Sequence, residues 1–194
     1  VSGDILSRIL GRYADSQPKG FQGGVYDNNN ATSTYGNINL YAGAGTVVIY
    51  SNNDFTINHN IIVANGSYAN TADIPQVLII APNIYISSNV TRIDAWLIAK
   101  DQSSSKGIVD TCKEFRDRST QANDVCNQLL TVNGPVFAMK VLFHRTAGAG
   151  VGYSSIDPAE RFNLSAANYL WAYSQAEQLN QAFTTYSREL APRY

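Results

Sequence analysis

The charged residues best suited to chemistry lie near the middle of the 194-residue chain. Arg92, Asp94, Lys100 and Asp101 follow one another closely, and Asp110 comes soon after them. Carboxylates that hold Ca²⁺ beside a lysine or arginine base are the groups with which β-helical polysaccharide lyases cleave acidic sugars. The simpler interpretation places these residues at the solvated ends of strands. We therefore assign no catalytic residue and keep a lyase-like enzyme as an alternative.

Other catalytic and metal-binding patterns are missing from the sequence. The two histidines, His59 and His144, are far apart, and no HExxH, GxSxG or CxxC motif occurs. We expect His59 at a corner between strands, and His144 beside Arg145 at a surface strand end. The sequence thus predicts no metal site, no cofactor and no enzymatic activity.

Two cysteines, Cys112 and Cys126, flank a polar segment typical of a loop. A disulfide between them would close a short loop and contribute about 3 kcal/mol in the chain-entropy model. A metal site is disfavoured because no histidine is near in sequence. We predict the disulfide, with free buried thiols as the alternative. A disulfide implies an oxidising, extracellular or cell-surface location.

Uncharged polar residues dominate the composition. The net charge is -1 and charged residues make up only 15%, so no electrostatic attraction to nucleic acid or to an acidic membrane is expected. Tyrosine is frequent, with twelve copies. Its ring can stack on a sugar while its hydroxyl stays hydrated. The candidates for glycan stacking are Tyr35, Tyr41, Tyr50, Tyr68 and Tyr85.

Short apolar runs between residues 37 and 145 must build the scaffold for these side chains. The runs are too short and too rich in valine and isoleucine for helices. Runs that start at 47, 55 and 61 match runs that start at 77, 84 and 90, which gives a period of about 30 residues. We expect an inward column of Val47, Ile49, Ile57, Val77, Ile79, Ile86, Leu97, Leu130 and Val132.

Asparagines follow these runs at matching places. Asn60, Asn89 and Asn133 each come three residues after an apolar residue. Asparagine tolerates the left-handed backbone of a corner, and its amide can bond to the asparagine of the next coil. Such corners are typical of a parallel β-solenoid.

A short parallel β-solenoid with a C-terminal helical segment is therefore the predicted fold. An antiparallel β-sandwich is the alternative, although Asn65-Gly66 is the one clear hairpin signal. We divide the chain into a lead-in segment, the solenoid with its disulfide loop at 100–128, and a helical cap and tail. The boundaries are 1–36, 37–145 and 146–194.

The segments outside the solenoid contain helix signals. A helical face of Ile5, Leu6, Ile9, Leu10 and Tyr13 competes with a strand in the lead-in segment. Asp157-Pro-Ala-Glu160 predicts one helix start, and Ser165 predicts the cap of a longer helix through Leu179. The expected apolar face of that helix holds Tyr169, Ala172, Tyr173, Ala176 and Leu179. A helix laid over an open solenoid end would hide unpaired strand edges.

Several of these stretches together resemble a known group of proteins. They are Arg92–Ala99, the cysteine pair, Leu130–Val136, His144–Gly148, Pro158–Glu160, Asn168–Tyr173 and Tyr186–Tyr194. Over residues 85–194 the chain is similar to the C-terminal region of large uncharacterised surface proteins of candidate-phylum (Saccharibacteria-type) bacteria. Ala191-Pro192 departs from the Pro-Pro of that pattern. The resemblance implies an exported protein and no known activity.

A non-catalytic module of an exported bacterial cell-surface protein, structural or adhesive, is the predicted function. A glycan-binding module and a lyase-like enzyme are the alternatives. The sequence has neither a signal peptide nor an 18-residue apolar stretch, so we expect a fragment of a longer protein that does not itself insert into a membrane. Its expected partners are neighbouring modules of the same protein or surface glycan.

Overall fold

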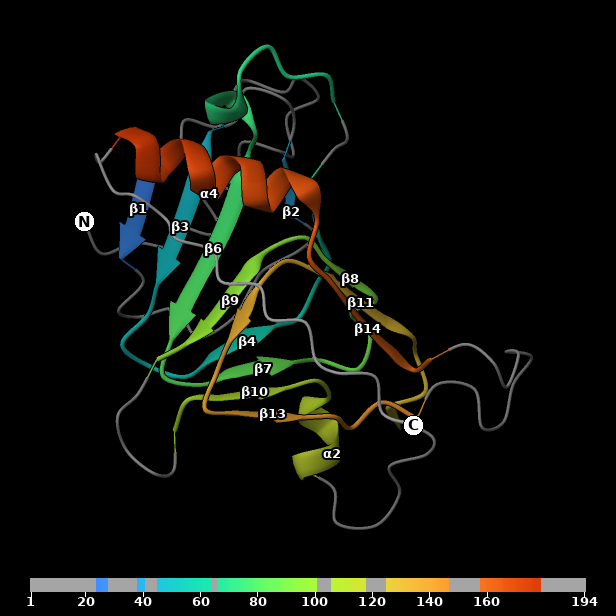
Figure 1. Cartoon of the computed structure of the whole chain (residues 1–194). Helices are drawn as coiled ribbons and strands as arrows, with labels where there is room; N and C mark the ends of the chain where they lie inside the picture. The colour runs from blue at the N-terminus through green and yellow to red at the C-terminus, as the bar shows by residue number, and fades with distance from the viewer. Residues whose placement is uncertain are drawn as a thin grey trace, which may run out of the picture.

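The computed structural model describes residues 24–27, 38–40, 45–63, 66–100, 106–117, 125–146 and 158–178. Within these ranges the chain forms fourteen strands in three parallel sheets, and successive coils stack on one another (Figure 1). The predicted parallel β-solenoid is therefore confirmed. The antiparallel sandwich is wrong, because the strand pairs of all three sheets are parallel.

We number the three sheets in the order in which each coil visits them. The first sheet contains β1 (Gly24–Asp27), β3 (Thr46–Tyr50), β6 (Gln76–Ala81), β9 (Trp96–Ala99) and β12 (Val136–Phe137). The second contains β4 (Phe55–Ile57), β7 (Ile84–Ile86), β10 (Ile108–Asp110) and β13 (Lys140–Leu142). The third contains β2 (Ile38–Leu40), β5 (Ile61–Val63), β8 (Arg92–Ile93), β11 (Leu130–Asn133) and β14 (Glu160–Asn163). Because β1 and β14 join these sheets, the solenoid extends beyond residues 37–145 at both ends.

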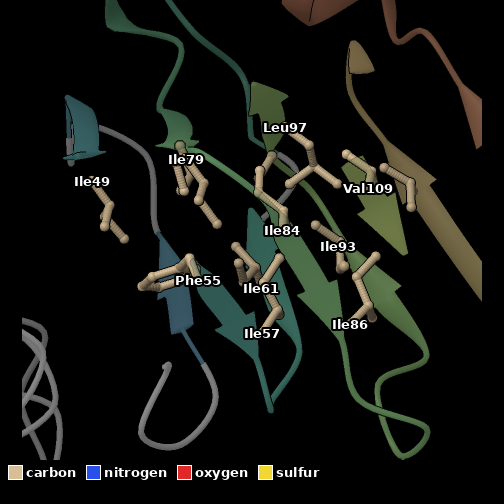
Figure 2. Close-up of a cluster of buried hydrophobic side chains, with 14 of the residues drawn as sticks. Ile49, Phe55, Ile57, Ile61, Ile79, Ile84, Ile86, Ile93, Leu97 and Val109 are labelled. Carbon is tan, nitrogen blue, oxygen red and sulfur yellow. The ribbon is translucent and has the colours of Figure 1, made fainter. Parts of the chain in front are cut away.

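The core is a column of inward side chains that continues from coil to coil (Figure 2). In β3, β7, β9 and β11 alternate residues point inward; in β3, for example, Val47 and Ile49 are buried between partly exposed neighbours. All nine residues predicted for this column are at most 3% exposed, which confirms the inward assignment. The column also contains residues that the prediction missed, namely Phe55, Ile61, Ile84, Val90, Ile93 and Val109.

The period of about 30 residues holds for two of the three sheets. Val47 pairs with Val77 in the first sheet, and Phe55 pairs with Ile84 in the second. In the third sheet the expected start at 90 is wrong, because Ile61 pairs with Ile93. The backbone N–H of Val90 donates to Ser87 O at 3.1 Å, so Val90 belongs to the turn before β8.

The corner asparagines occupy two different corners rather than one. Asn60, after β4, accepts from the backbone N–H groups of Thr91 and Arg92 at 2.8 and 3.1 Å. Asn89 donates to Asn58 O at the same corner, at 2.9 Å. Asn133 instead lies where the third sheet turns into the first, and Asn163 of the next coil donates to its amide oxygen at 3.0 Å. The common position expected for all three asparagines is therefore wrong.

The region after residue 157 begins with a strand. The helix start predicted at Asp157-Pro-Ala-Glu160 is wrong, because Glu160–Asn163 form β14 and pair with β11 in register. The cap predicted at Ser165 is confirmed. Its hydroxyl accepts from the N–H of Asn168 at 3.3 Å, and α4 (Ala166–Gln178) follows.

The helix α4 lies along the side of the solenoid. It crosses the starts of β6 and β3 and ends above β1 (Figure 1). The expected placement over an open end is therefore wrong. The expected apolar face is right for Ala176, which is buried, but wrong for Tyr169 and Tyr173, which are 60% and 55% exposed, and Trp171 is buried instead. Trp171 supplies the apolar contact that the tyrosines were expected to make.

Some sequence predictions fall outside the described residues. They concern the lead-in helix, Tyr35, Tyr41, Asp101, Asp157 as a cap, Leu179 and the chain after Gln178.

The predicted disulfide between Cys112 and Cys126 is confirmed. Both sulfur-bearing residues are fully buried, and the short helix α2 (Lys113–Asp117) begins directly after Cys112. The backbone N–H of Thr146 donates to Cys126 O at 2.9 Å, so the loop closed by the disulfide is also attached to the last coil.

Removing the disulfide with Cys112→Ser and Cys126→Ser together is expected to lower the free energy of unfolding by about 3 kcal/mol, because the unfolded chain regains the entropy of an open loop. Urea denaturation of both proteins measures this difference. Thiol titration of the unreduced wild-type protein should detect no free thiol. Two free thiols per chain would contradict both the bridge and the oxidising location inferred from it.

Candidate functional site

A cavity of about 400 Å³ lies where the third sheet turns into the first. Its walls come from β5, β8 and β11, from the loop that contains η1 (Thr71–Asp73), and from the first turns of α4. The polar side chains that line it are Tyr68, Gln76, Arg92, Asp94, Asn133, Ser165 and Asn168. A concave site of this size that combines apolar walls with a few converging polar groups is typical of small-ligand binding.

Asp94 lies at the centre of the hydrogen bonds beneath the cavity. It directly follows β8, and it accepts from the Arg92 Nε at 3.0 and 3.1 Å and from Nη2 at 2.8 Å. The Val63 backbone N–H donates to Oδ2 at 2.9 Å, and the Asn133 amide donates to Oδ1 at 2.7 Å. Asp94 thereby links three successive coils.

The carboxylate of Asp94 is enclosed by its hydrogen-bond donors. Its side chain is only 9% exposed, and both of its oxygens already accept from several donors. The side chain of Arg92 is 42% exposed, and Arg92 lines the cavity. The hydrogen bonds and charge of Asp94 raise the pKa of Arg92 above its ordinary value, so Arg92 is a permanent cation.

A ladder of amides continues from Asp94 to the last coil and to α4. Asn133 bonds to Asp94, Asn163 bonds to Asn133, and Asn168 donates to Asn133 O at 3.4 Å. Asn168 is buried although it lies on the first turn of α4. This ladder attaches the helix to the corner that forms the cavity.

Two tryptophans hold α4 against the first sheet. The Trp171 ring packs edge-on against Trp96, with centroids 5.5 Å apart. Trp171 Nε1 donates to Thr46 Oγ1 at 3.1 Å, and Trp96 Nε1 donates to Gln76 Oε1 at 2.8 Å. Both indole N–H groups donate hydrogen bonds, so the tryptophans hold the cavity wall without leaving a buried donor unpaired.

The structure brings only part of the lyase-like residue set together. Arg92 and Asp94 share the cavity, but Lys100 follows β9 and its N–H donates to Ala81 O at the opposite end of the first sheet. Asp110 is fully buried at the end of β10 and bonds to His144. The described members of the set therefore lie at three separate places.

The candidate stacking tyrosines are also dispersed. Tyr50 ends β3 on the first sheet, whereas Tyr85 lies in β7 on the second sheet and donates to Asp54 at 3.3 Å. Tyr68 belongs to the loop after β5 and lines the cavity. Of the tyrosines that the structure describes, Tyr68 alone combines an aromatic ring with the cavity.

Of the two predicted histidine positions, that of His59 is confirmed and that of His144 is not. His59 lies at the corner between β4 and β5, as expected. His144 is a poor match for a surface strand end, because its Nδ1 lies 2.9 Å from Asp110 Oδ1 and its ring stacks on Phe115. Arg145 is buried rather than exposed, with hydrogen bonds to three backbone carbonyl oxygens. These contacts between coils were invisible in the sequence because 29 to 58 residues separate the partners.

Comparisons with protein-family models, with curated proteins and with solved structures found no match. In the described ranges no three acidic, histidine or cysteine side chains gather as metal ligands. None of the helices that the structure describes is both long and apolar enough to cross a membrane. The functional inference therefore depends on the cavity itself.

The cavity contains residues that sequence inspection did not select. Gln76, Asn133 and Asn168 come from β6, β11 and α4, and they meet only because the coils stack and α4 packs back on them. Asn133 was noticed only as a corner residue. Asn168 could have been selected from the sequence. It lies three residues after the capping Ser165, and a polar residue at that position can face the protein rather than solvent.

Proposed function

We propose that this chain is a non-catalytic, adhesive module of an exported bacterial cell-surface protein, and that it binds glycan in the cavity beside Arg92. One observation carries the proposal. The cavity offers amide, guanidinium and aromatic groups to a ligand, while its single carboxylate is fully hydrogen-bonded. Amide groups and an aromatic ring suit sugar hydroxyls and the apolar face of a sugar ring.

The scaffold supports an adhesive function in two further ways. Stacked coils make a stiff support, because each coil is held to its neighbours by continuous backbone hydrogen bonds. The disulfide fits an oxidising compartment outside the cytoplasm. The resemblance to bacterial surface proteins over residues 85–194 favours the same location and adds neighbouring modules of a longer protein as partners.

The lyase alternative receives less support. An elimination reaction needs a free base near the sugar, and calcium-dependent lyases need several carboxylates around one ion. Asp94 is held by four donor groups, and Lys100 and Asp110 lie elsewhere. We therefore expect binding without cleavage.

Glycan binding by the full chain should depend on Tyr68. Changing Tyr68→Ala is expected to weaken binding roughly tenfold, because the loss of an aromatic contact costs on the order of 1 kcal/mol beyond the buried area. Isothermal titration with oligosaccharides chosen from a panel of neutral and acidic polysaccharides and peptidoglycan fragments measures the effect.

Tyr173→Ala is the matched control, because Tyr173 is exposed on α4 and does not line the cavity. Its affinity should equal that of the wild type. Failure of the wild-type chain to bind any member of the panel would reject the proposal. Unsaturated or shortened products after incubation, with or without Ca²⁺, would reject its non-catalytic part.

A further inference from the structure

The guanidinium of Arg92 has two edges that can each grip a planar anion. Its side edge, formed by Nε and Nη2, is occupied by Asp94 through contacts of 2.8–3.1 Å. Its outer edge, formed by Nη1 and the second Nη2 hydrogen, makes no hydrogen bond with the described residues. Two parallel N–H donors at such an edge match the two oxygens of a carboxylate.

Asp94 holds this outer edge in place. The carboxylate is itself fixed by the Val63 N–H and by the Asn133 amide, so the arginine is bonded to a rigid partner. Ordering a long side chain before the ligand arrives removes an entropy cost from binding. Arg92 therefore resembles a preorganised receptor group more than a mobile surface arginine.

The charges of the cavity favour an anion at this place. Arg92 and Asp94 are the charged residues among those lining the cavity. The side chain of Arg92 is 42% exposed, whereas that of Asp94 is 9% exposed and its carboxylate accepts from four donor atoms. An entering ligand thus meets the more exposed Arg92 side chain first, while the carboxylate of Asp94 is engaged by Arg92, by the Val63 N–H and by the Asn133 amide.

We infer that the cavity selects acidic sugars, and that the outer edge of Arg92 binds the ligand carboxylate. This inference depends on the proposed glycan binding and adds the class of sugar. The apolar wall of Ile74, Pro75 and Leu170 leaves room for one face of the sugar ring. The amides of Asn133 and Gln76 lie in the same lining and suit its hydroxyls.

The test compares three probes on the full chain: an oligomer of galacturonic acid, its methyl ester, and a sulfated neutral oligosaccharide of equal length. The wild type should bind the free acid roughly tenfold or more tightly than the ester, because the ester cannot form a charged bidentate contact. Tighter binding of the sulfated probe would overturn the assignment to a carboxylate.

Two variants locate the effect. Arg92→Met should abolish the preference for the acid, while Arg92→Lys should retain only part of it, because lysine lacks the planar fork. Lys140→Met, which removes an exposed charge on β13 outside the cavity, should leave the preference unchanged. Circular dichroism establishes that each variant is folded.

The outcomes separate this inference from the proposed function. Equal affinity of the wild type for acid and ester overturns the acid selectivity and leaves glycan binding standing, and this comparison requires no variant. Absence of binding to any glycan rejects both. A preference for the acid that survives in folded Arg92→Met would show that another group reads the carboxylate.

Discussion

Replacing Arg145 by methionine is expected to lower the free energy of unfolding by about 3–5 kcal/mol, the usual cost of removing one partner from a buried charged network. Arg145 is 7% exposed, and its guanidinium donates to Thr111 O at 2.6 Å, to Ser87 O at 2.7 Å and to Ser88 O. Methionine fills a similar volume but leaves these three carbonyl oxygens without their donor.

Carboxylates around Arg145 add to the effect. Asp110, Glu114 and Glu160 all interact with its charge, and one oxygen each of Asp110 and Glu160 is buried without a hydrogen-bond partner among the described residues. Removal of the cation takes away the favourable charge interaction of these carboxylates with Arg145. The loss should therefore exceed that of an ordinary hydrogen bond.

The pH dependence of this contribution follows from burial. Desolvation lowers the pKa of Arg145 from its ordinary value to about 10, although the three carboxylates oppose the shift. Between these two values the unfolded chain keeps a proton that the folded chain loses, so this group's contribution to the unfolding free energy rises with pH. Below about pH 9 Arg145 is protonated in both the folded and the unfolded chain. Titration of Arg145 should then cause no further change with pH in the difference in unfolding free energy between wild type and variant.

Urea denaturation at pH 7 measures the prediction, with Lys140→Met as the control. Lys140 is exposed on β13, and its replacement should change stability by less than about 0.5 kcal/mol. Equal losses for the two variants would mean that the buried network contributes nothing beyond net charge.

Truncation of the core is the second large effect. Ile79→Ala should cost about 2–5 kcal/mol, as is usual for large-to-small changes in a well-packed interior. Ile79 is fully buried and pairs with Ile49 on one side and Leu97 on the other, so the missing atoms leave a void that two neighbouring coils would both have to fill. Ile86→Ala should behave similarly, because Ile86 pairs with Ile57.

Ile80→Ala is the control for this prediction. Ile80 is the next residue of β6 but points outward and is only partly buried, so it should cost clearly less than Ile79. Chemical denaturation of the three variants gives the comparison. Similar values for Ile79 and Ile80 would contradict the inward assignment of the column.

The repeating parts of the fold could be predicted because neighbouring coils impose the same requirement on each strand. Valine and isoleucine at alternate positions mark the inward face, and Val47 over Val77 follows from the period alone. The period fails for Ile93, because residues 87–91 form a turn whose length no neighbouring repeat predicts. Local signals such as the Ser165 cap and the cysteine pair were also readable, since each depends on few residues.

The candidate site could be predicted only in part. Arg92 and Asp94 attracted attention as charged neighbours, but their function as a held cation depends on Asn133, which lies 39 residues from Asp94. Insertions of unequal length precede β10 and β11, so the pairing of Asn133 with Asp94 cannot be read from spacing. The burial of Arg145 was missed for the same reason, because its acceptors lie 34 to 58 residues away.

Because α4 runs along the stacked strands of the first sheet (Figure 1), its length must match the number of coils that it crosses. Its 13 residues span about 20 Å at 1.5 Å per residue, which equals about four spacings between stacked strands. A gene duplication that inserted one more coil would push the first sheet's early strands about 5 Å beyond the reach of Trp171. Growth by one coil would therefore require about three additional helical residues, so the number of coils and the length of the helix must evolve together.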